Sequence, residues 1–203
     1  MKQKQNKINM ANKRNKGWLI PLILILLICV IPLYSCNGGI KNYKRADAEA
    51  DKLKRIAVLP LENLTSNQYA DEKIQSLVIM DLLSRDVDVI EPGEVMRAFK
   101  ELRIRSFEPI SERDMQSVGD MLNVDFLIKG SVGTFEMKQG TAVSYPEVSI
   151  HLMLVEKESG EILWSVWHTS GGANFWTRHF GAEGSTLDET ARKVIREVFD
   201  TLI

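Results

Sequence analysis

Histidines are the side chains of this sequence with the widest chemistry, because imidazole binds metals and transfers protons near neutral pH. The chain has three, His151, His168 and His179. A zinc site usually takes ligands at close spacing, such as H-x₃-H, and these residues do not have it. His151 and His168 fall on two segments expected to pair as strands, where they could face each other. Histidines on a strand surface are the simpler interpretation, so we expect no metal site.

Motifs for catalysis are also missing from the sequence. It contains no G-x-S-x-G, H-E-x-x-H or Walker sequence. Residues 181–186 have the composition of a phosphate loop, but they lack the lysine before the serine, and Glu183 repels phosphate. Ser185 as a helix N-cap, with Asp188 three residues later, explains the segment better. No carboxylate pair stands out as an acid–base couple. We therefore expect no enzyme activity and no cofactor.

The thiol of Cys36 has a different chemistry, because it follows an export signal. Residues 1–35 contain six Lys or Arg and no Asp or Glu, and residues 18–32 carry no charge. A basic start, an apolar core and a small residue before the cut are typical of a secretory signal. Leu33-Tyr34-Ser35-Cys36 resembles the bacterial lipobox, although Tyr34 is bulkier than usual. This resemblance implies cleavage before Cys36, which then carries a diacylglycerol thioether and an N-acyl lipid.

The alternative to this lipid anchor is an uncleaved transmembrane helix. Residues 17–35 include two prolines and are borderline for the roughly 20 apolar residues that span a bilayer. The second cysteine, Cys29, leaves with the signal, so no disulfide forms within the mature chain. Position 37 is Asn, not the Asp that commonly retains lipoproteins in the inner membrane. We therefore expect the periplasmic face of the outer membrane.

The charge of the chain divides at the same point. The signal carries +6 and residues 36–203 carry −7, so the formal net charge of −1 hides an acidic mature protein. Such a protein has no general basic surface for nucleic acid, which we exclude as a partner. Residues 36–54 predict a lipidated N-terminus and a solvated tether, whose 18 steps span at most roughly 60 Å. One domain is expected over residues 55–203.

Hydrophobic spacing in that domain predicts an α/β fold. The expected strands are 55–61, 87–90, 125–138, 143–156 and 162–169, with a turn at 157–160. The expected helices are 69–85, 93–104, one that begins after Ser111 and one that begins after Ser185. Gly130 and Gly133 are expected to bend or bulge their strand. The order β-α-β-α-α-β-β-β-α predicts a single mixed sheet with helices packed on it, whose late hairpin is antiparallel.

Large aromatic residues gather in the segment 162–180. Alternation along the expected strand places Trp164 and Trp167 on opposite faces, one in the core and the other toward helices or solvent. The general burial of large aromatic side chains favours a segment that folds over a sheet edge. The alternative is a surface for protein partners or lipid headgroups, since Trp and Arg are enriched at binding hot spots. The candidate patch consists of Trp167, Phe175, Trp176, Arg178 and His179.

Four stretches of the sequence are similar to known envelope domains. They are RIAVLPLENLT at 55–65, VDVIEP at 87–92, LNVDFLIKG at 122–130 and the hairpin at 150–165. They resemble CsgG-like and TolB N-terminal-like domains, a group that includes the LpoB-like activators of peptidoglycan synthases. The resemblance spans about residues 55–200 and implies an α/β sandwich.

These observations predict a non-enzymatic outer-membrane lipoprotein. Its domain is expected to act as an interaction or accessory module in envelope assembly, export or cell-wall maintenance, with envelope proteins or copies of itself as partners. The alternatives are a regulator of a peptidoglycan synthase and, less favoured, an enzyme with a dispersed active site. A secretion pore is disfavoured, because the only long hairpin, 143–169, is assigned to the core sheet and no other segment supplies membrane strands of about 9–11 residues. A synthase regulator on so short a tether needs a partner that reaches outward.

Overall fold

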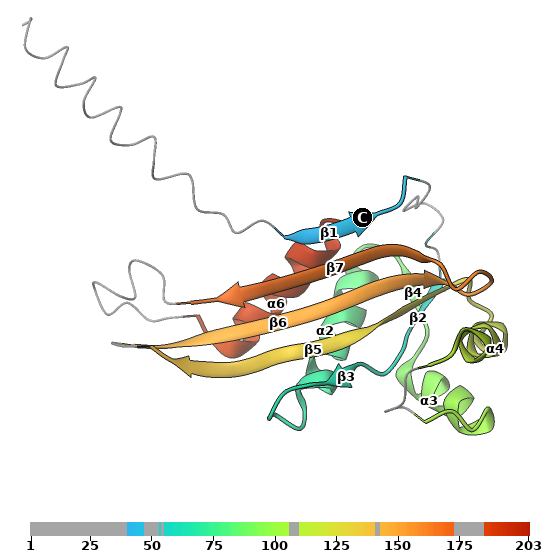
Figure 1. Cartoon of the computed structure of the whole chain (residues 1–203), viewed down its shortest axis with the longest axis horizontal. Helices are drawn as coiled ribbons and strands as arrows, with labels where there is room; N and C mark the ends of the chain where they lie inside the picture. The colour runs from blue at the N-terminus through green and yellow to red at the C-terminus, as the bar shows by residue number, and fades with distance from the viewer. Residues whose placement is uncertain (1–39, 47–52, 54, 106–109, 141–142, 173–184) are drawn as a thin grey trace, which may run out of the picture. The chain divides into compact units, whose positions relative to one another are not determined.

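An open mixed sheet of seven strands carries helices on both of its faces (Figure 1). The computed structural model describes residues 40–46, 53, 55–105, 110–140, 143–172 and 185–203. The strand order is β1-β7-β6-β5-β2-β4, and β3 pairs with β5 beside this path. The predicted fold class, a mixed sheet with helices packed on it, is confirmed.

Parallel pairing is confined to the early strands. β2 (Arg55–Val58) lies between β4 (Asp88–Val89) and β5 (Phe126–Gln139) and runs parallel to both. The two-residue strand β3 (Glu62–Asn63) is also parallel to β5. The apolar run that begins at Arg55 alternates its side chains between two core clusters, so β2 is buried on both sides.

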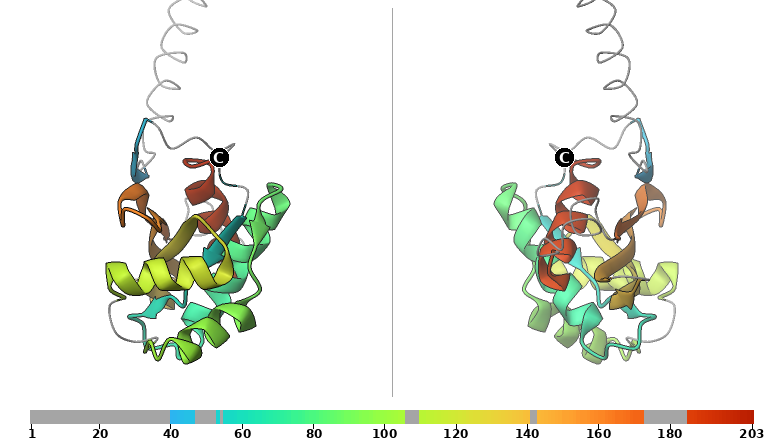
Figure 2. Two further views of the ribbon diagram at one scale, coloured as in Figure 1. Left: turned by 90° about the vertical axis from the view of Figure 1, so that its right-hand side faces the viewer. Right: turned by 90° about the vertical axis from the view of Figure 1, so that its left-hand side faces the viewer.

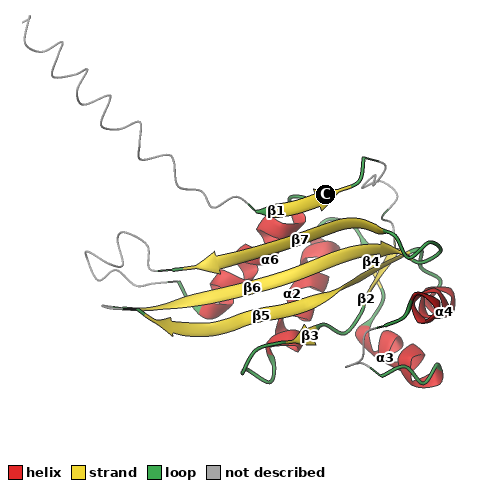
Figure 3. Ribbon diagram, in the orientation of Figure 1, coloured by secondary structure: helices red, strands yellow, loops and turns green. Residues whose placement is uncertain are grey.

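The two faces of the sheet carry different helices. α2 (Ala70–Ser84) and α6 (Leu187–Phe199) cover one face and lie behind the sheet in the view of Figure 3. α3 (Pro92–Glu101) and α4 (Glu112–Leu122) pack on the opposite face, at β2 and β5. Figure 2 shows these layers along the strands. The predicted helices are confirmed to within three residues at each end.

The late strands β6 (Ser144–Glu156) and β7 (Ile162–Gly171) form the predicted antiparallel hairpin. Its turn is fixed against α4, because Lys157 Nζ donates a hydrogen bond to Asp120 at 3.0 Å. This bond outweighs the opposing effect of burial and raises the pKa of Lys157, with further attraction from Asp125 and Glu158. The turn and the helix are therefore held as one unit.

Glycines at two positions of β5 have different roles. A Cβ at Gly130 would collide with the carbonyl oxygen of His151 on β6, so only glycine fits there. Gly133 lies at the shift of register between Val132 and Thr134, which is a β-bulge. The predicted bulge is confirmed at Gly133, whereas Gly130 serves a close approach of two backbones.

Three sequence predictions are wrong in detail. Lys41–Lys44, which were expected within the tether, form β1 and pair with β7. Ile40, directly before β1, packs against the core. The segment between the expected strand 55–61 and the expected helix 69–85, predicted to be a loop, contains β3. The N-cap of α6 is Thr186, not Ser185, and a reciprocal pair of hydrogen bonds joins it to Glu189 at 3.2 and 2.9 Å. Both short strands are polar and depend on distant partners, which explains why local hydrophobicity did not reveal them.

Candidate functional site

The two tryptophans of β7 point to opposite faces of the sheet, as alternation predicted. Trp164 is fully buried beneath α6, where it stacks on Phe199 with ring centroids 5.7 Å apart. Its indole N–H donates to Thr201 Oγ1 at 2.9 Å, which satisfies the one polar atom of the ring. Trp167 is 60% exposed. The outward face of β7 therefore presents a large aromatic side chain to solvent.

Neighbouring strands build a surface around Trp167. Register places Lys41 of β1 and His151 of β6 directly opposite Trp167. The next row along the strands pairs Tyr43, Ser165, Met153 and Lys129 in the same way. Residues paired across a sheet share a face. We name this surface the Trp167 face: Lys41, Tyr43, Lys129, His151, Met153, Ser165 and Trp167.

The centre of the Trp167 face is held in place by side-chain contacts. The indole of Trp167 stacks on His151, with centroids 5.7 Å apart and planes 26° from parallel. His151 Nε2 lies 3.1 Å from Ser165 Oγ, at hydrogen-bond distance. These two contacts restrict the rotamers of the aromatic pair, so a partner meets an already ordered surface.

Charge and polarity make the Trp167 face suited to binding rather than to catalysis. Tyr43 is 57% exposed and adds a second amphipathic ring. Within the part of the chain that the structure describes, Lys41 and Lys129 make no ion pair. Rigid aromatic rings with free cations beside them are typical of protein-binding hot spots, which favour acidic and apolar partners.

The other residues of the predicted sites lie outside the described residues. These are Phe175, Trp176, Arg178 and His179 of the aromatic patch, and the lipidation residue Cys36. Trp167 is thus the one member of the predicted patch for which the structure gives a position. Sequence reasoning missed His151, Met153 and the residues of β1, because their place beside Trp167 follows from strand register. The length of the 157–160 turn does not give that register by itself, because the register shifts between Leu154 and Val155, which lie between the turn and His151.

His151 and His168 do not face each other. His168 is paired with Ile150 on the core face, and its Nε2 lies 2.7 Å from Glu197 Oε2 on α6. His151 points to the opposite face. Within the described ranges, no group of three His, Cys, Asp or Glu side chains is arranged to hold a metal ion. No helix in the same ranges is long and apolar enough to cross a membrane.

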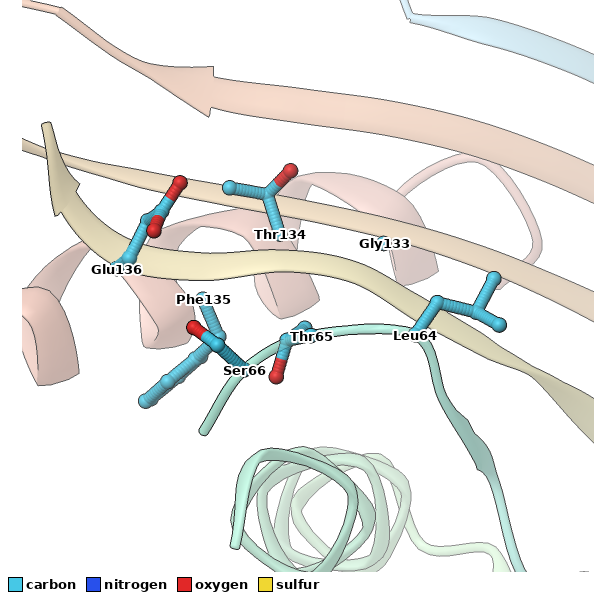
Figure 4. A pocket seen from close by; sticks show the side chains of 7 residues that line it. All are labelled: Leu64, Thr65, Ser66, Gly133, Thr134, Phe135 and Glu136. Carbon is cyan, nitrogen blue, oxygen red and sulfur yellow. The ribbon is translucent and has the colours of Figure 1, made fainter. Parts of the chain in front are cut away.

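A small hollow lies where the loop after β3 meets β5 (Figure 4). It has a volume of about 190 Å³ and lies between residues 64–66 and 133–136. Asn63 organises the loop: its side-chain oxygen accepts from the N–H and hydroxyl of Thr65, at 3.0 and 2.8 Å. Its amide donates to Asn67 and Asp71. Asn63 and Thr65 of the stretch RIAVLPLENLT therefore have a structural role in shaping this loop.

Comparison with known proteins gives the family. A family model described as peptidoglycan-synthase activator LpoB matches residues 38–167. The chain belongs to this family. The match runs from β1 to Trp167 and so includes most of the described sheet. No curated protein matches the sequence. The resemblance to CsgG-like and TolB N-terminal-like domains stays a prediction.

Solved structures share the fold at low sequence identity. The PelC dodecamer from Paraburkholderia phytofirmans is 20% identical, with a TM-score of 0.55, over 81% of this chain and 98% of that chain. Lipoprotein GNA1162 from Neisseria meningitidis is 16% identical, with a TM-score of 0.50, over 58% of this chain and 82% of its own. These similarities establish the architecture and leave the function to the family match and the surface.

Proposed function

We propose that this protein is a lipid-anchored regulator that binds and activates a peptidoglycan synthase from the periplasmic face of the outer membrane. The observation that carries the proposal is the match of residues 38–167 to the synthase-activator family. From the sequence alone, this function is an alternative to a broader envelope role. The family match now favours it, and a regulator needs a binding surface rather than a catalytic centre.

The Trp167 face is the surface we assign to the synthase. It combines exposed rings of Trp167 and Tyr43 with the cations of Lys41 and Lys129, on strands that the rest of the sheet keeps rigid. Truncating a central aromatic residue of an interface commonly costs about 2 kcal/mol or more. Such a loss weakens binding by about thirtyfold. Lysines at its rim accelerate association with an acidic partner.

The short segment between the lipid anchor and β1 determines where this protein can meet the synthase. Five peptide units separate Cys36 from the first residue of β1, and an extended chain spans at most about 18 Å over that length. This is shorter than the tether expected from sequence, because β1 belongs to the sheet. Once Cys36 is lipidated, the synthase has to reach toward the outer membrane. Cys36→Ala is expected to abolish lipid labelling and membrane retention; labelling that survives the substitution contradicts the anchor.

The proposal is tested by measuring binding between the full-length lipidated protein and the purified synthase of the same bacterium. Trp167→Ala is expected to raise the Kd by about thirtyfold, corresponding to about 2 kcal/mol. Leu83→Ala is the matched control, because Leu83 is an exposed apolar residue on α2, which covers the opposite face of the sheet. Its Kd should stay within about twofold of the wild-type value. Absence of binding by the wild-type protein refutes the function, and equal effects of both substitutions refute the surface.

A second candidate is a role that depends on self-assembly. It is favoured by one observation: a structure with the same architecture, PelC, is described as a dodecamer. Light scattering of the full-length protein in detergent distinguishes the two, since a regulator that binds the synthase as one copy has the mass of a monomer.

A further inference from the structure

The outer surface of α2 carries more apolar side chains than a solvent-facing helix needs. Its buried stripe contains Ile74, Val78 and Leu82, yet Met80 and Leu83 on other sides are 57% and 53% exposed. A helix that is apolar on several sides is usually covered on several sides. Contiguous exposed apolar surface marks a site of interaction.

A groove accompanies these side chains where α2 lies against α6. Leu77, Met80 and Ile195 supply its apolar lining, and its volume is about 220 Å³. The polar residues that line it are Asp81, Ser84, Arg192 and Arg196. α2 and α6 lie on one face of the sheet (Figure 1). Trp167 points to the other face, so the groove and the Trp167 face are on opposite sides of the sheet.

The carboxylates around the groove are engaged in ion pairs. Near the start of both helices, Lys73 Nζ lies 3.5 Å from Asp188 Oδ1. Near their ends, Arg85 binds Asp81 and Asp200, each at 2.7 Å. Both bonds favour the charged guanidinium and outweigh the desolvation that opposes it, so the pKa of Arg85 is raised. These pairs fix α2 beside α6 and leave their carboxylates neutralised.

Two cations between these ion pairs have no such partner. Arg192 and Arg196 are exposed, one helical turn apart on α6, and both line the groove. Neither guanidinium makes an ion pair with any residue that the structure describes. The groove thus offers an apolar floor and an uncompensated charge of about +2, which is complementary to carboxylates.

We propose that this groove binds an acidic segment of a partner protein. An apolar side chain of the segment enters between Leu77, Met80 and Ile195, and its carboxylates pair with Arg192 and Arg196. A hollow fits a side chain better than it fits the flat surface of a bilayer. The site is separate from the Trp167 face, so the protein can hold two partners at once.

The test places a diazirine-bearing amino acid at position 80 of the full-length protein and irradiates the cells that produce it. The cross-linked product is then sequenced by mass spectrometry. The proposal predicts a protein segment with net negative charge and at least one large apolar residue at the site of attachment. In the Arg192→Glu, Arg196→Glu variant the yield of this product should fall about tenfold, which corresponds to about 1.4 kcal/mol. Arg113→Glu on α4 is the matched control and should leave the yield unchanged.

Several results would overturn the proposal. They are the absence of a product, attachment to lipid or to a second copy of this chain, attachment to a segment without net negative charge, and a yield that the double variant does not change. The neutral variant Arg192→Gln, Arg196→Gln should give an intermediate yield, and circular dichroism should show that all variants are folded. Each result leaves the synthase assignment untouched, because that assignment is tested at Trp167.

Discussion

Alanine substitutions at Trp164 and at Trp167 compare the same change on the two faces of one strand. Trp164 is fully buried, stacks on Phe199 and donates a hydrogen bond to Thr201, whereas Trp167 is 60% exposed. Truncation of a buried tryptophan costs about 3–5 kcal/mol, and the lost hydrogen bond about 1 kcal/mol. The Thr201 hydroxyl still donates to the Val198 carbonyl, so the substitution leaves this hydroxyl with a hydrogen-bond partner. We expect Trp164→Ala to lower the free energy of unfolding by about 4–6 kcal/mol.

The largest loss of unfolding free energy expected for Trp167→Ala is smaller than the loss expected for Trp164→Ala. Two-fifths of this residue is covered, or about 80 Å² of a side chain of about 200 Å². At about 25 cal/mol per Å², Trp167→Ala costs at most about 2 kcal/mol, and less because the unfolded chain already hides some surface. The two substitutions should therefore differ by at least about 2 kcal/mol.

Urea unfolding followed by far-ultraviolet circular dichroism measures this difference without relying on tryptophan fluorescence. Trp164→Phe, which keeps most of the apolar volume, provides a measurable transition where the alanine variant does not fold. A loss at Trp167 equal to that at Trp164 would refute the assignment of the two faces.

Three further predictions concern local structure. Thr186→Ala should lower the free energy of unfolding by about 1 kcal/mol, because it removes the N-cap of α6, and Ser185→Ala should change it little; the reverse order in urea titrations contradicts the cap. Gly130→Ala should cost about 1–3 kcal/mol more than Gly133→Ala, because the added methyl collides with the β6 backbone; equal thermal midpoints contradict this close approach. The pKa of Lys157 is raised from 10.5, so its stabilising effect is complete below that value and is lost as pH rises through the folded-state value. The stability difference between wild type and Lys157→Met should therefore shrink above pH 10.5, and a constant difference contradicts the bond to α4.

Residues that act through local spacing could be predicted from the sequence. Ile74, Val78 and Leu82 follow the helical period, and Trp164 and Trp167 follow the strand period, so α2 and the two faces of β7 were foreseen. The hairpin was foreseen for the same reason, with its turn at 157–160.

Features that depend on distant pairing could not be predicted in this way. All four residues of β1 are polar and exposed, and they become a strand because β7 offers an unpaired edge. Glu62 and Asn63 form β3 because they pair with Ser131 and Val132 of β5. Ser185 and Thr186 are each followed three residues later by a carboxylate, so the capping pattern alone does not decide between them. The stack of Trp167 on His151 needs the register of β6 and β7, which a bulge shifts.

We propose that this protein activates a peptidoglycan synthase through the Trp167 face. The decisive measurement is the rate at which the synthase of the same bacterium polymerises its lipid-linked precursor, with and without the full-length lipidated protein. We expect a faster rate with the wild-type protein and a smaller increase with Trp167→Ala at the same concentration. A rate that the wild-type protein leaves unchanged at every concentration would contradict it.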